Sequence, residues 1–268
     1  SRLPVDDCIG KTISIALFCL LLCSGWNDCV SDLSCVMYTL DDFQNGQVFL
    51  VDKPLEWTSF QVVNKIHWLI RKQYDIKKIK VGHAGTLDPL ATGLLLICTG
   101  KKTKQIQELM GADKTYTGTI CLGATTPSYD LETEVIPHAD PSSLTAQQLK
   151  ITKKQFLGRI QQKPPIFSAI KQKGKRLYEH ARAGEQVNIP SREVIVHEFE
   201  ITKINLPDVA FRIRCGKGTY IRSIANDFGE ALGVGGYLKS LCRTAIGNYT
   251  LADSLSIDNF ERNLKALS

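Results

Sequence analysis

Two different periods of hydrophobic positions run along this chain and predict both strands and helices. Residues 47–54 (QVFLVDKP) form a short apolar run that ends at a proline, which is typical of a strand leading into a loop. Residues 115–123 alternate between apolar and polar positions, as a half-buried strand does. The apolar run at 93–98 (GLLLIC) predicts a buried strand, and two more strands are expected at 192–205 and 209–215.

Apolar residues spaced by three and four positions predict two helices. The first follows the capping residues Thr58 and Ser59, and its apolar positions are Phe60, Val63, Ile66 and Leu69/Ile70. The second lies within 217–233, and its apolar positions are Ile221, Ile224, Ala225, Phe228 and Leu232. Because strands and helices do not alternate strictly, we expect an α+β fold with a mixed, largely antiparallel sheet flanked by helices.

Two segments of the chain predict surface structure. Residues 124–152 are polar and rich in Thr, Ser, Pro and Asp, with a helical stretch near 145–157, which indicates an insertion on the surface. Residues 166–184 predict a strand, a basic turn and a short helix that ends at Gly184.

The first 46 residues differ in character from the rest. Residues 13–23 (ISIALFCLLLC) form an apolar run of signal-peptide length that is too short to span a bilayer, and the charges before it cancel. A poorly ordered or non-native extension, an added packing element and a membrane-associated segment all stay open. We expect an extension of uncertain structure at 1–46 and one catalytic domain at 47–268.

Composition and charge narrow the classes of function. Of the 268 residues, 43% are hydrophobic and 22% are charged, which excludes wholesale disorder, and no apolar run reaches the 18 residues of a membrane-spanning helix. The net charge of +6 is an average, because residues 1–46 carry −4 and residues 47–268 carry +10. A basic body fits a polyanion such as RNA or DNA, although a generic solvated surface would show the same excess.

Cysteines and histidines do not indicate a disulfide framework or a metal site. Five of the nine cysteines fall in the first 46 residues, the total is odd and no C-x-x-C pair occurs. We interpret Cys98, Cys121, Cys215 and Cys242 as small buried hydrophobic residues in a reducing compartment. The five histidines show no metal-ligand spacing, and the segment 93–103 fails the spacing of a phosphate-binding loop.

One loop combines the residue types of a catalytic site. Gly82–Pro89 reads GHAGTLDP and holds a histidine and Asp88 among glycines and a proline. Asp-Pro is also a common turn dipeptide, so the residues alone leave a turn former and a functional carboxylate both open. No second carboxylate and no cysteine lie nearby in sequence, so a metal site or a glycosidase-like acid pair is not supported locally.

The segment GHAGTLDPLATG resembles the signature of the TruB family of RNA pseudouridine synthases. Other blocks similar to the family follow in the expected order around it: VDKP with Lys53, DKTY ending at Tyr116, PPIFSAIKQKGKRLYEHAR at 164–182, KGTYIRS with Tyr220 and Arg222, and LCR with Leu241 and Arg243. The resemblance covers roughly residues 47–262. It implies a pseudouridine synthase-like fold.

The resemblance also implies a reaction, the isomerisation of uridine to pseudouridine in RNA, most commonly at position 55 in the T-arm of tRNA. Such a reaction needs no cofactor and no metal. Asp88 would be the essential catalytic residue, as a nucleophile or as a base on the ribose, and the sequence leaves both roles open.

By the same resemblance, two further residues are catalytic and five bind the substrate. Arg222 would pair with Asp88 and keep it ionised, and Tyr116 would stack on the flipped base and assist proton transfer. The expected substrate-binding residues are Lys53 as a support, His83 in the space that the base vacates, Tyr220 and Leu241 as pocket walls, and Arg243. For Tyr220 and Leu241 a purely structural role in the core stays open.

The expected partner is RNA, the tRNA T-arm stem-loop, and not DNA. The basic runs at 77–80, 101–104 and 171–176 and the insertion at 124–152 would contact it. The chain ends soon after Arg243, so it resembles a short form without the carboxy-terminal PUA domain of many family members. A guide-RNA-dependent synthase subunit and a non-catalytic RNA chaperone are the alternatives. We expect a cytoplasmic monomer without stable membrane association.

Overall fold

The computed structural model describes residues 38–168, 171–172, 175–176 and 188–266. The apolar run predicted at 13–23 and the short helix predicted before Gly184 lie outside the described residues.

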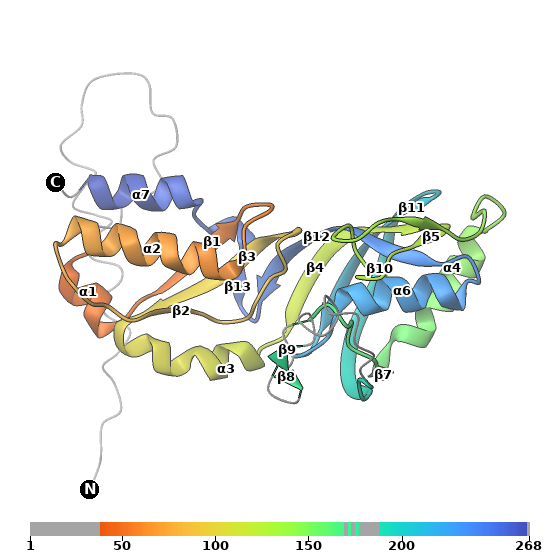
Figure 1. Cartoon of the computed structure of the whole chain (residues 1–268), viewed down its shortest axis with the longest axis horizontal. Coiled ribbons are helices and arrows are strands. Elements are labelled where there is room, and N and C mark those ends of the chain that lie inside the picture. Colours follow the sequence, from red (N-terminus) through yellow and green to blue (C-terminus); the bar gives the residue numbers. More distant parts are fainter. Residues whose placement is uncertain (1–37, 169–170, 173–174, 177–187, 267–268) are drawn as a thin grey trace, which may run out of the picture. The chain divides into compact units, whose positions relative to one another are not determined.

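One large sheet organises these residues (Figure 1). Its strands are β1 (Val48–Lys53), β2 (Val81–His83), β3 (Ala91–Thr99), β4 (Lys114–Leu122), β7 (Gly158–Gln162), β10 (Arg192–Asn205), β11 (Asp208–Cys215), β12 (Gly236–Ile246) and β13 (Tyr249–Thr250). The main order is β1-β3-β12-β4-β11-β10-β7, with β2 paired to β3 and β13 to β12. Within this described sheet only β3 and β12 run parallel, so the expectation of a mixed, largely antiparallel sheet with helices is confirmed.

Two short hairpins stand apart from the large sheet. They pair β5 (Ala124–Thr125) with β6 (Ile136–Pro137) and β8 (Lys171–Gln172) with β9 (Lys175–Arg176). The first lies within the polar segment that the sequence predicts as a surface insertion, and it pairs with no strand of the large sheet.

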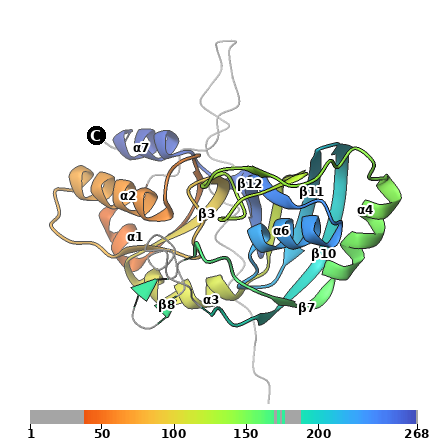
Figure 2. The same ribbon diagram turned by 45° about the vertical axis from the view of Figure 1, so that its right-hand side comes forward.

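Helices pack near both ends of the large sheet (Figure 2). They are α1 (Leu40–Asn45), α2 (Ser59–Gln73), α3 (Ile106–Gly111), α4 (Ala146–Thr152), α6 (Ile221–Ala231) and α7 (Ile257–Lys265), with short 3-10 turns η2 (Gly100–Gln105), η3 (Lys153–Phe156) and η4 (Leu251–Asp253). Helices α2 and α7 lie side by side near β1, whereas α6 lies against β12. None of the described helices is long and apolar enough to cross a membrane.

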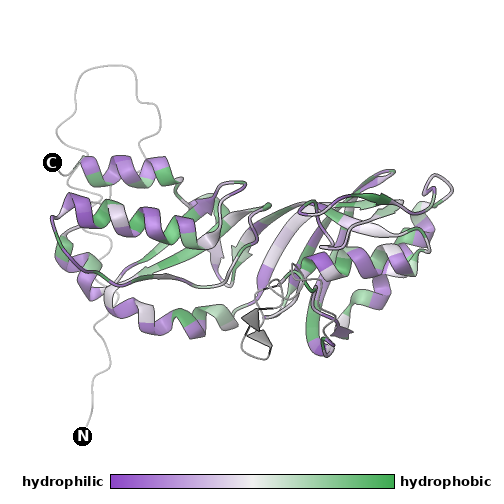
Figure 3. Ribbon diagram, viewed as in Figure 1, coloured by the Kyte–Doolittle hydropathy of each residue, from purple (hydrophilic) through white to green (hydrophobic). Residues whose placement is uncertain are grey.

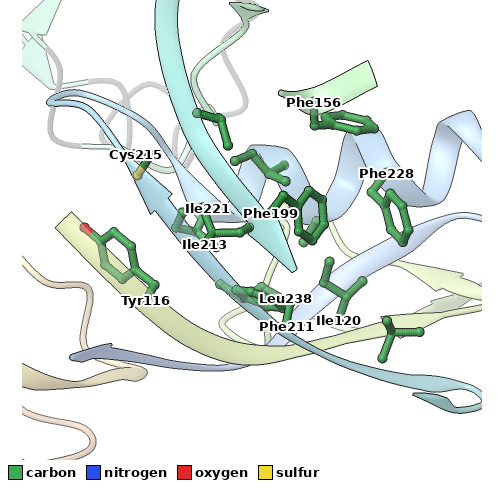
Figure 4. Packing of buried hydrophobic residues seen from close by; sticks show 14 of the residues in the cluster. Tyr116, Ile120, Phe156, Phe199, Phe211, Ile213, Cys215, Ile221, Phe228 and Leu238 are labelled. Carbon is green, nitrogen blue, oxygen red and sulfur yellow. The ribbon is translucent and has the colours of Figure 1, made fainter. Parts of the chain in front are cut away.

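One hydrophobic core lies between α6 and strands β4, β10, β11 and β12. The rings of Phe199 and Phe228 meet edge to face with centroids 5.6 Å apart, and Phe156 lies 5.9 Å from Phe228 (Figure 4). Such aromatic pairs add stability beyond the area they bury. Ile224 and Ala225 of α6 are fully buried against them, so this helix is held rigidly on the sheet.

A second core holds α1, α2 and α7 against β1 and β3. Phe43 of α1 is fully buried and stacks on Phe49 of β1, which in turn meets Phe260 of α7. Hydrophobic positions face this core while hydrophilic positions line the outer sides of α2 and α7 (Figure 3). The packed body therefore includes α1, which precedes Gln47.

The strands predicted at 47–54, 93–98, 115–123, 192–205 and 209–215 are confirmed as β1, β3, β4, β10 and β11. The strand predicted at the start of 166–184 is not formed at 166–168, which are bends. The predicted buried position of Phe60 is wrong, because its side chain is 67% exposed. The buried stripe of α2 instead contains Val62 and Ile66, and Phe60 lies about 200° from Val62 around the helix axis.

The second predicted helix starts later than expected. Residues 217–220 form a turn, with Gly218 at φ +81°, and α6 begins at Ile221. The sequence pattern also does not predict strand β12. Irregularities between Leu238 and Ser240 and between Arg243 and Ala245 break the two-residue alternation that marks a strand.

Candidate active site

The loop between β2 and β3 carries Asp88 and is tied down at both ends. The Ser59 hydroxyl at the start of α2 accepts a hydrogen bond from the Leu87 amide (2.8 Å) and donates to its carbonyl (3.1 Å). Lys53 at the end of β1 is completely buried, and its Nζ donates to the carbonyls of Pro54 (2.9 Å), Trp57 (2.6 Å) and Pro89 (3.3 Å). These bonds fix the backbone on either side of Asp88.

Arg243 of β12 holds the first half of the same loop. It is 1% exposed, and its guanidinium donates to the carbonyls of Leu94 (2.8 Å), Gly85 (3.0 Å) and Thr86 (3.5 Å). Strand β3 approaches β12 closely because Gly93 lacks a side chain, since a Cβ there would lie 2.4 Å from the Arg243 carbonyl oxygen. Arg243 therefore lines the site mainly as a support for its loop.

Arg222 of α6 lies between two carboxylates. Its Nε is 2.8 Å from Asp88 Oδ2 and 3.7 Å from Asp130 Oδ2, and its Nη1 donates to the Ser128 carbonyl at 3.2 Å. The Arg222 and Asp130 side chains are 4% and 6% exposed, whereas that of Asp88 is 37% exposed. The buried arginine is thus oriented from behind, and the accessible carboxylate faces the cavity.

Opposing electrostatic effects act on the pKa of the Asp88 carboxyl. Burial raises the pKa of the Asp88 carboxyl above its ordinary value, Arg222 counteracts this rise, and the like charge of Asp130 adds to it. Desolvation makes a carboxylate a stronger base and nucleophile than it is in water, and Arg222 offsets part of this effect while it orients the group.

The cavity in front of Asp88 has a volume of about 300 Å³. The described residues that line it come from the loop after β2, from α3, β4, β10 and β12, and from the turn that leads into α6. They are Gly85, Thr86, Leu87, Asp88, Met110, Lys114, Tyr116, Arg192, Gly216, Gly218, Thr219, Tyr220, Ile221, Arg222, Leu241 and Arg243. Six of the eight residues predicted for the site are brought together here.

Two aromatic rings line this cavity. Tyr116 of β4 is 9% exposed and pairs in register with Arg243, and burial raises the pKa of its hydroxyl while Arg243 lowers it. Tyr220 is the residue before α6, and its backbone amide and carbonyl bond to the side chain of Gln162 at 2.8 Å and 3.0 Å. The guanidinium of Arg192 lies 4.8 Å from the Tyr220 ring centre, at cation–π distance. Both rings are thereby held in place by neighbouring arginines that also line the cavity.

The other two predicted residues, Lys53 and His83, lie outside the cavity lining. Lys53 supports the Asp88 loop from below, and its burial lowers its pKa to about 8. His83 ends β2, and burial lowers its pKa as well, with the charge of Arg243 as the next cause. The substrate-binding roles of both residues stay predictions.

The sequence analysis did not predict three residues that hold the site in place. Asp130 lies in the polar segment that reads as a surface insertion, so its burial has no sequence signal there. Lys114 looks like an ordinary surface lysine but is 7% exposed and caps α3, where Nζ donates to the Met110 and Ala112 carbonyls. Gln162 is 1% exposed, and only its bonds to Tyr220 reveal its role.

The donor set at this site suits acid–base or nucleophilic chemistry by one carboxylate. The described residues contain no group of three or more His, Cys, Asp or Glu side chains that could hold a metal ion. The planar hydrophobic walls and the bulk of Tyr116 and Tyr220 fit a flat heterocyclic ring beside Asp88.

Comparisons with known proteins identify a family and several relatives of this chain. Residues 71–221, more than half of the chain, match the family model of the TruB family pseudouridylate synthases (N-terminal domain). The chain is 57% identical over 228 residues to tRNA pseudouridine synthase B of Flavobacterium johnsoniae, which covers 85% of this chain and 100% of that protein. It is 50% identical over 219 residues to the protein of the same name from Phocaeicola vulgatus, which covers 82% and 93%.

Among solved structures, a chain in a Cbf5-Nop10-Gar1 complex superimposes with a TM-score of 0.60 and 30% identity. The match covers 82% of this chain and 54% of that one, so this chain spans about half the length of that structural relative. A second match, with a TM-score of 0.59 and 28% identity, is an H/ACA RNP bound to a substrate RNA containing 2'-deoxyuridine. From the family match and the two close relatives together, the chain belongs to the TruB family of pseudouridylate synthases.

Proposed function

We propose that this protein isomerises uridine to pseudouridine in tRNA, at the uridine of the T-arm loop. The observation that carries the proposal is the Asp88–Arg222 ion pair at 2.8 Å, with Asp88 exposed to a cavity lined by two tyrosines. The relatives named tRNA pseudouridine synthase B, at 57% and 50% identity, support the choice of tRNA.

The reaction breaks one bond and forms another within the same nucleotide. The C1′–N1 glycosidic bond of uridine breaks, the uracil turns without leaving, and C1′ bonds to C5. The hydrogen on C5 is lost as a proton and N1 gains a proton, so no electrons are exchanged with a cofactor. Asp88 acts on the ribose, as a nucleophile at C1′ or as a base, and Arg222 keeps its carboxylate oriented.

A uridine in a folded RNA loop must leave its stack before Asp88 can reach it. Unstacking costs a few kcal/mol, and stacking on an aromatic side chain in the enzyme offsets that cost. Tyr116 and Tyr220 supply aromatic faces on the cavity wall, and Leu241 from β12 supplies an apolar one. We assign Tyr116 to the base and the proton transfer, and Tyr220 and Leu241 to the walls.

We also propose that the protein acts as a monomer, and in the cytoplasm. Cys98, Cys121, Cys215 and Cys242 are free thiols, which fits a reducing compartment, and tRNA as substrate points to the cytoplasm.

The test incubates a T-arm stem-loop transcript with purified wild type and with Asp88→Asn, and quantifies nucleosides by chromatography because isomerisation leaves the mass unchanged. We expect pseudouridine from the wild type and a loss of at least about 10³-fold in Asp88→Asn. An Asp258→Asn variant changes an exposed aspartate of α7, outside the cavity and the 124–152 insertion, and serves as the matched control.

Two outcomes contradict this proposal. Equal product from wild type and Asp88→Asn removes Asp88 from the chemistry. Product only after addition of a guide RNA or partner proteins favours a guide-dependent synthase subunit.

A further inference from the structure

A large groove lies outside the cavity that holds Asp88. Its volume is about 730 Å³, and segments from α1, from α2, from the stretch before β2 and from η2 form its walls. Its described lining residues are Gln44, His67, Lys77, Lys78, Ile79, Lys80, Gly100, Lys101, Thr103 and Lys104. No residue of the groove belongs to the catalytic cavity.

The backbone brings together the two lysine-rich segments of the groove, residues 77–80 and 101–104. Val81 of β2 pairs with Thr99 of β3, and the Gly100 amide donates to the Lys80 carbonyl at 2.9 Å. Gly100 has φ +49°, and a Cβ at this position would lie 2.1 Å from the Gln44 carbonyl oxygen of α1. Only glycine permits this close approach, so the groove has a fixed floor.

The charged side chains that line the described part of the groove are all positive. Lys77, Lys78, Lys80, Lys101 and Lys104 are all exposed, and the described lining contains no aspartate or glutamate. Lys101 donates one hydrogen bond to Asn45 Oδ1 at 3.0 Å, which leaves further ammonium donors for a ligand. Five neighbouring ammonium groups repel one another unless an anion lies between them.

The groove and the cavity are joined by two short segments of chain. From Lys80 the chain continues through β2 to Gly85, which lines the cavity, and this is at most about 16 Å of extended backbone. From Lys104 it continues into α3, whose Met110 also lines the cavity. One strand of a nucleic-acid helix carries a phosphate about every 3.4 Å of axis, so about five phosphates cover this span.

We propose that this lysine groove binds the phosphate backbone of the RNA whose uridine enters the cavity, several nucleotides away from that uridine. The inference rests on the proposed function and adds a second, sequence-independent contact to it. Lysines are compact point charges that bind phosphates without reading bases, and no aromatic ring lines the described groove apart from His67. The groove therefore positions the RNA, while the cavity selects the nucleotide.

The test compares a double variant in the groove, Lys78→Ala/Lys101→Ala, with a matched double variant elsewhere, Lys203→Ala/Lys265→Ala. All four lysines are exposed, and the second pair lies outside the groove and the cavity. The dissociation constant for whole unmodified tRNA is measured by filter binding from about 50 to 200 mM salt, and steady-state kinetics are measured on the same RNA.

We expect the groove variant to bind tRNA about tenfold more weakly, with the slope of log affinity against log salt shallower by about two. Its loss should appear in KM rather than in kcat, because the cavity is unchanged. The Lys203→Ala/Lys265→Ala control should bind like the wild type.

Unchanged affinity and slope in the groove variant overturn the proposal, as does an equal loss in the control. A loss of kcat with unchanged affinity also overturns it, since the groove would then act on the catalytic loop. Failure of the proposed function has a different signature, because the wild type would then form no pseudouridine although its binding to tRNA is still measured.

Discussion

Arg222 is shared by two carboxylates of unequal exposure, and this inequality separates their roles. Asp88 reaches the cavity, whereas Asp130 is buried behind the arginine, where its Oδ1 accepts a hydrogen bond from the Glu132 amide at 3.0 Å. Both carboxylates lie within ion-pair distance of one guanidinium, so removal of either changes the position and the charge balance of the other.

Asp130→Asn should shift the acid limb of the pH profile of kcat/KM to lower pH. The Asp88 carboxylate is active when ionised, and its raised pKa places the loss of activity above the pH of an ordinary aspartate. Removal of the Asp130 charge removes one cause of that rise, so the Asp88 pKa falls. A pH–rate series on wild type, on Asp130→Asn and on the control Asp258→Asn, whose aspartate is exposed, measures this shift. An acid limb that does not move in Asp130→Asn contradicts the coupling.

Lys53→Met should destabilise the fold by about 1–3 kcal/mol, because the carbonyls of Pro54, Trp57 and Pro89, which are part-buried in these hydrogen bonds, lose their donor. The pKa of Lys53 is lowered to about 8 in the folded state from 10.5, so burial of its charge opposes folding below pH 8. That opposition is relieved as pH rises from 8 to 10.5. The stability advantage of the wild type over Lys53→Met should therefore grow across this window, as measured by urea unfolding.

Individual residues of the site differ in how well the sequence predicts them. Asp88, Tyr116, Arg222 and Leu241 stand in blocks that resemble a known family, and the structure brings them to one cavity. Asp130 stands in a polar segment where an aspartate signals only solvent exposure. Its burial depends on the bridge to Leu238 of β12, a contact between distant parts of the chain that no local pattern reveals.

At the level of elements, the parallel pair of β3 and β12 is sensitive to substitution at Gly93. Gly93 has φ +100°, and Gly233 at the end of α6 has φ +74° with open space around it. Gly233→Ala should cost only the backbone penalty, about 1–2 kcal/mol. Gly93→Ala adds a 2.4 Å approach to the Arg243 carbonyl and should cost at least twice as much in thermal unfolding. Equal losses would show that β12 moves aside freely.

Helix and strand periodicity predicts the elements with regular burial and fails where burial is irregular. Strand β11 alternates strictly between buried and half-buried residues and was predictable for that reason. Strand β12 carries two irregularities, and its exposed Lys239 and Ser240 follow one another. At Phe60 the prediction fails in the opposite way. This apolar residue stands at helical spacing, but it lies on the exposed side of α2.

At the level of the whole molecule, the fold class follows from the order of elements, whereas the position of the cavity does not. The loop with Asp88 connects β2 and β3, which lie beside α2 and β1, and Arg222 belongs to α6, which lies against β12. Only the strand order β3-β12-β4, which brings together strands far apart in sequence, makes these two parts neighbours. Strand order of this kind is set by tertiary packing.

The net charge of the whole molecule predicts that RNA binding depends steeply on salt concentration. Residues 47–268 carry a net charge of +10. If at least five phosphates are neutralised, the slope of log affinity against log salt should be about −4 or steeper for tRNA. Filter binding over a salt series measures it. A flat slope would mean that the positive charges are merely solvated.

Arg243 and the Gly85 carbonyl that it holds are separated by 158 residues. During synthesis the loop with Asp88 therefore leaves the ribosome long before the strand that shapes it, and a nascent chain that stops short of β12 has no formed catalytic centre. The catalytic centre can therefore close only after β12 has been synthesised, and we expect a chain that lacks β12 to be inactive.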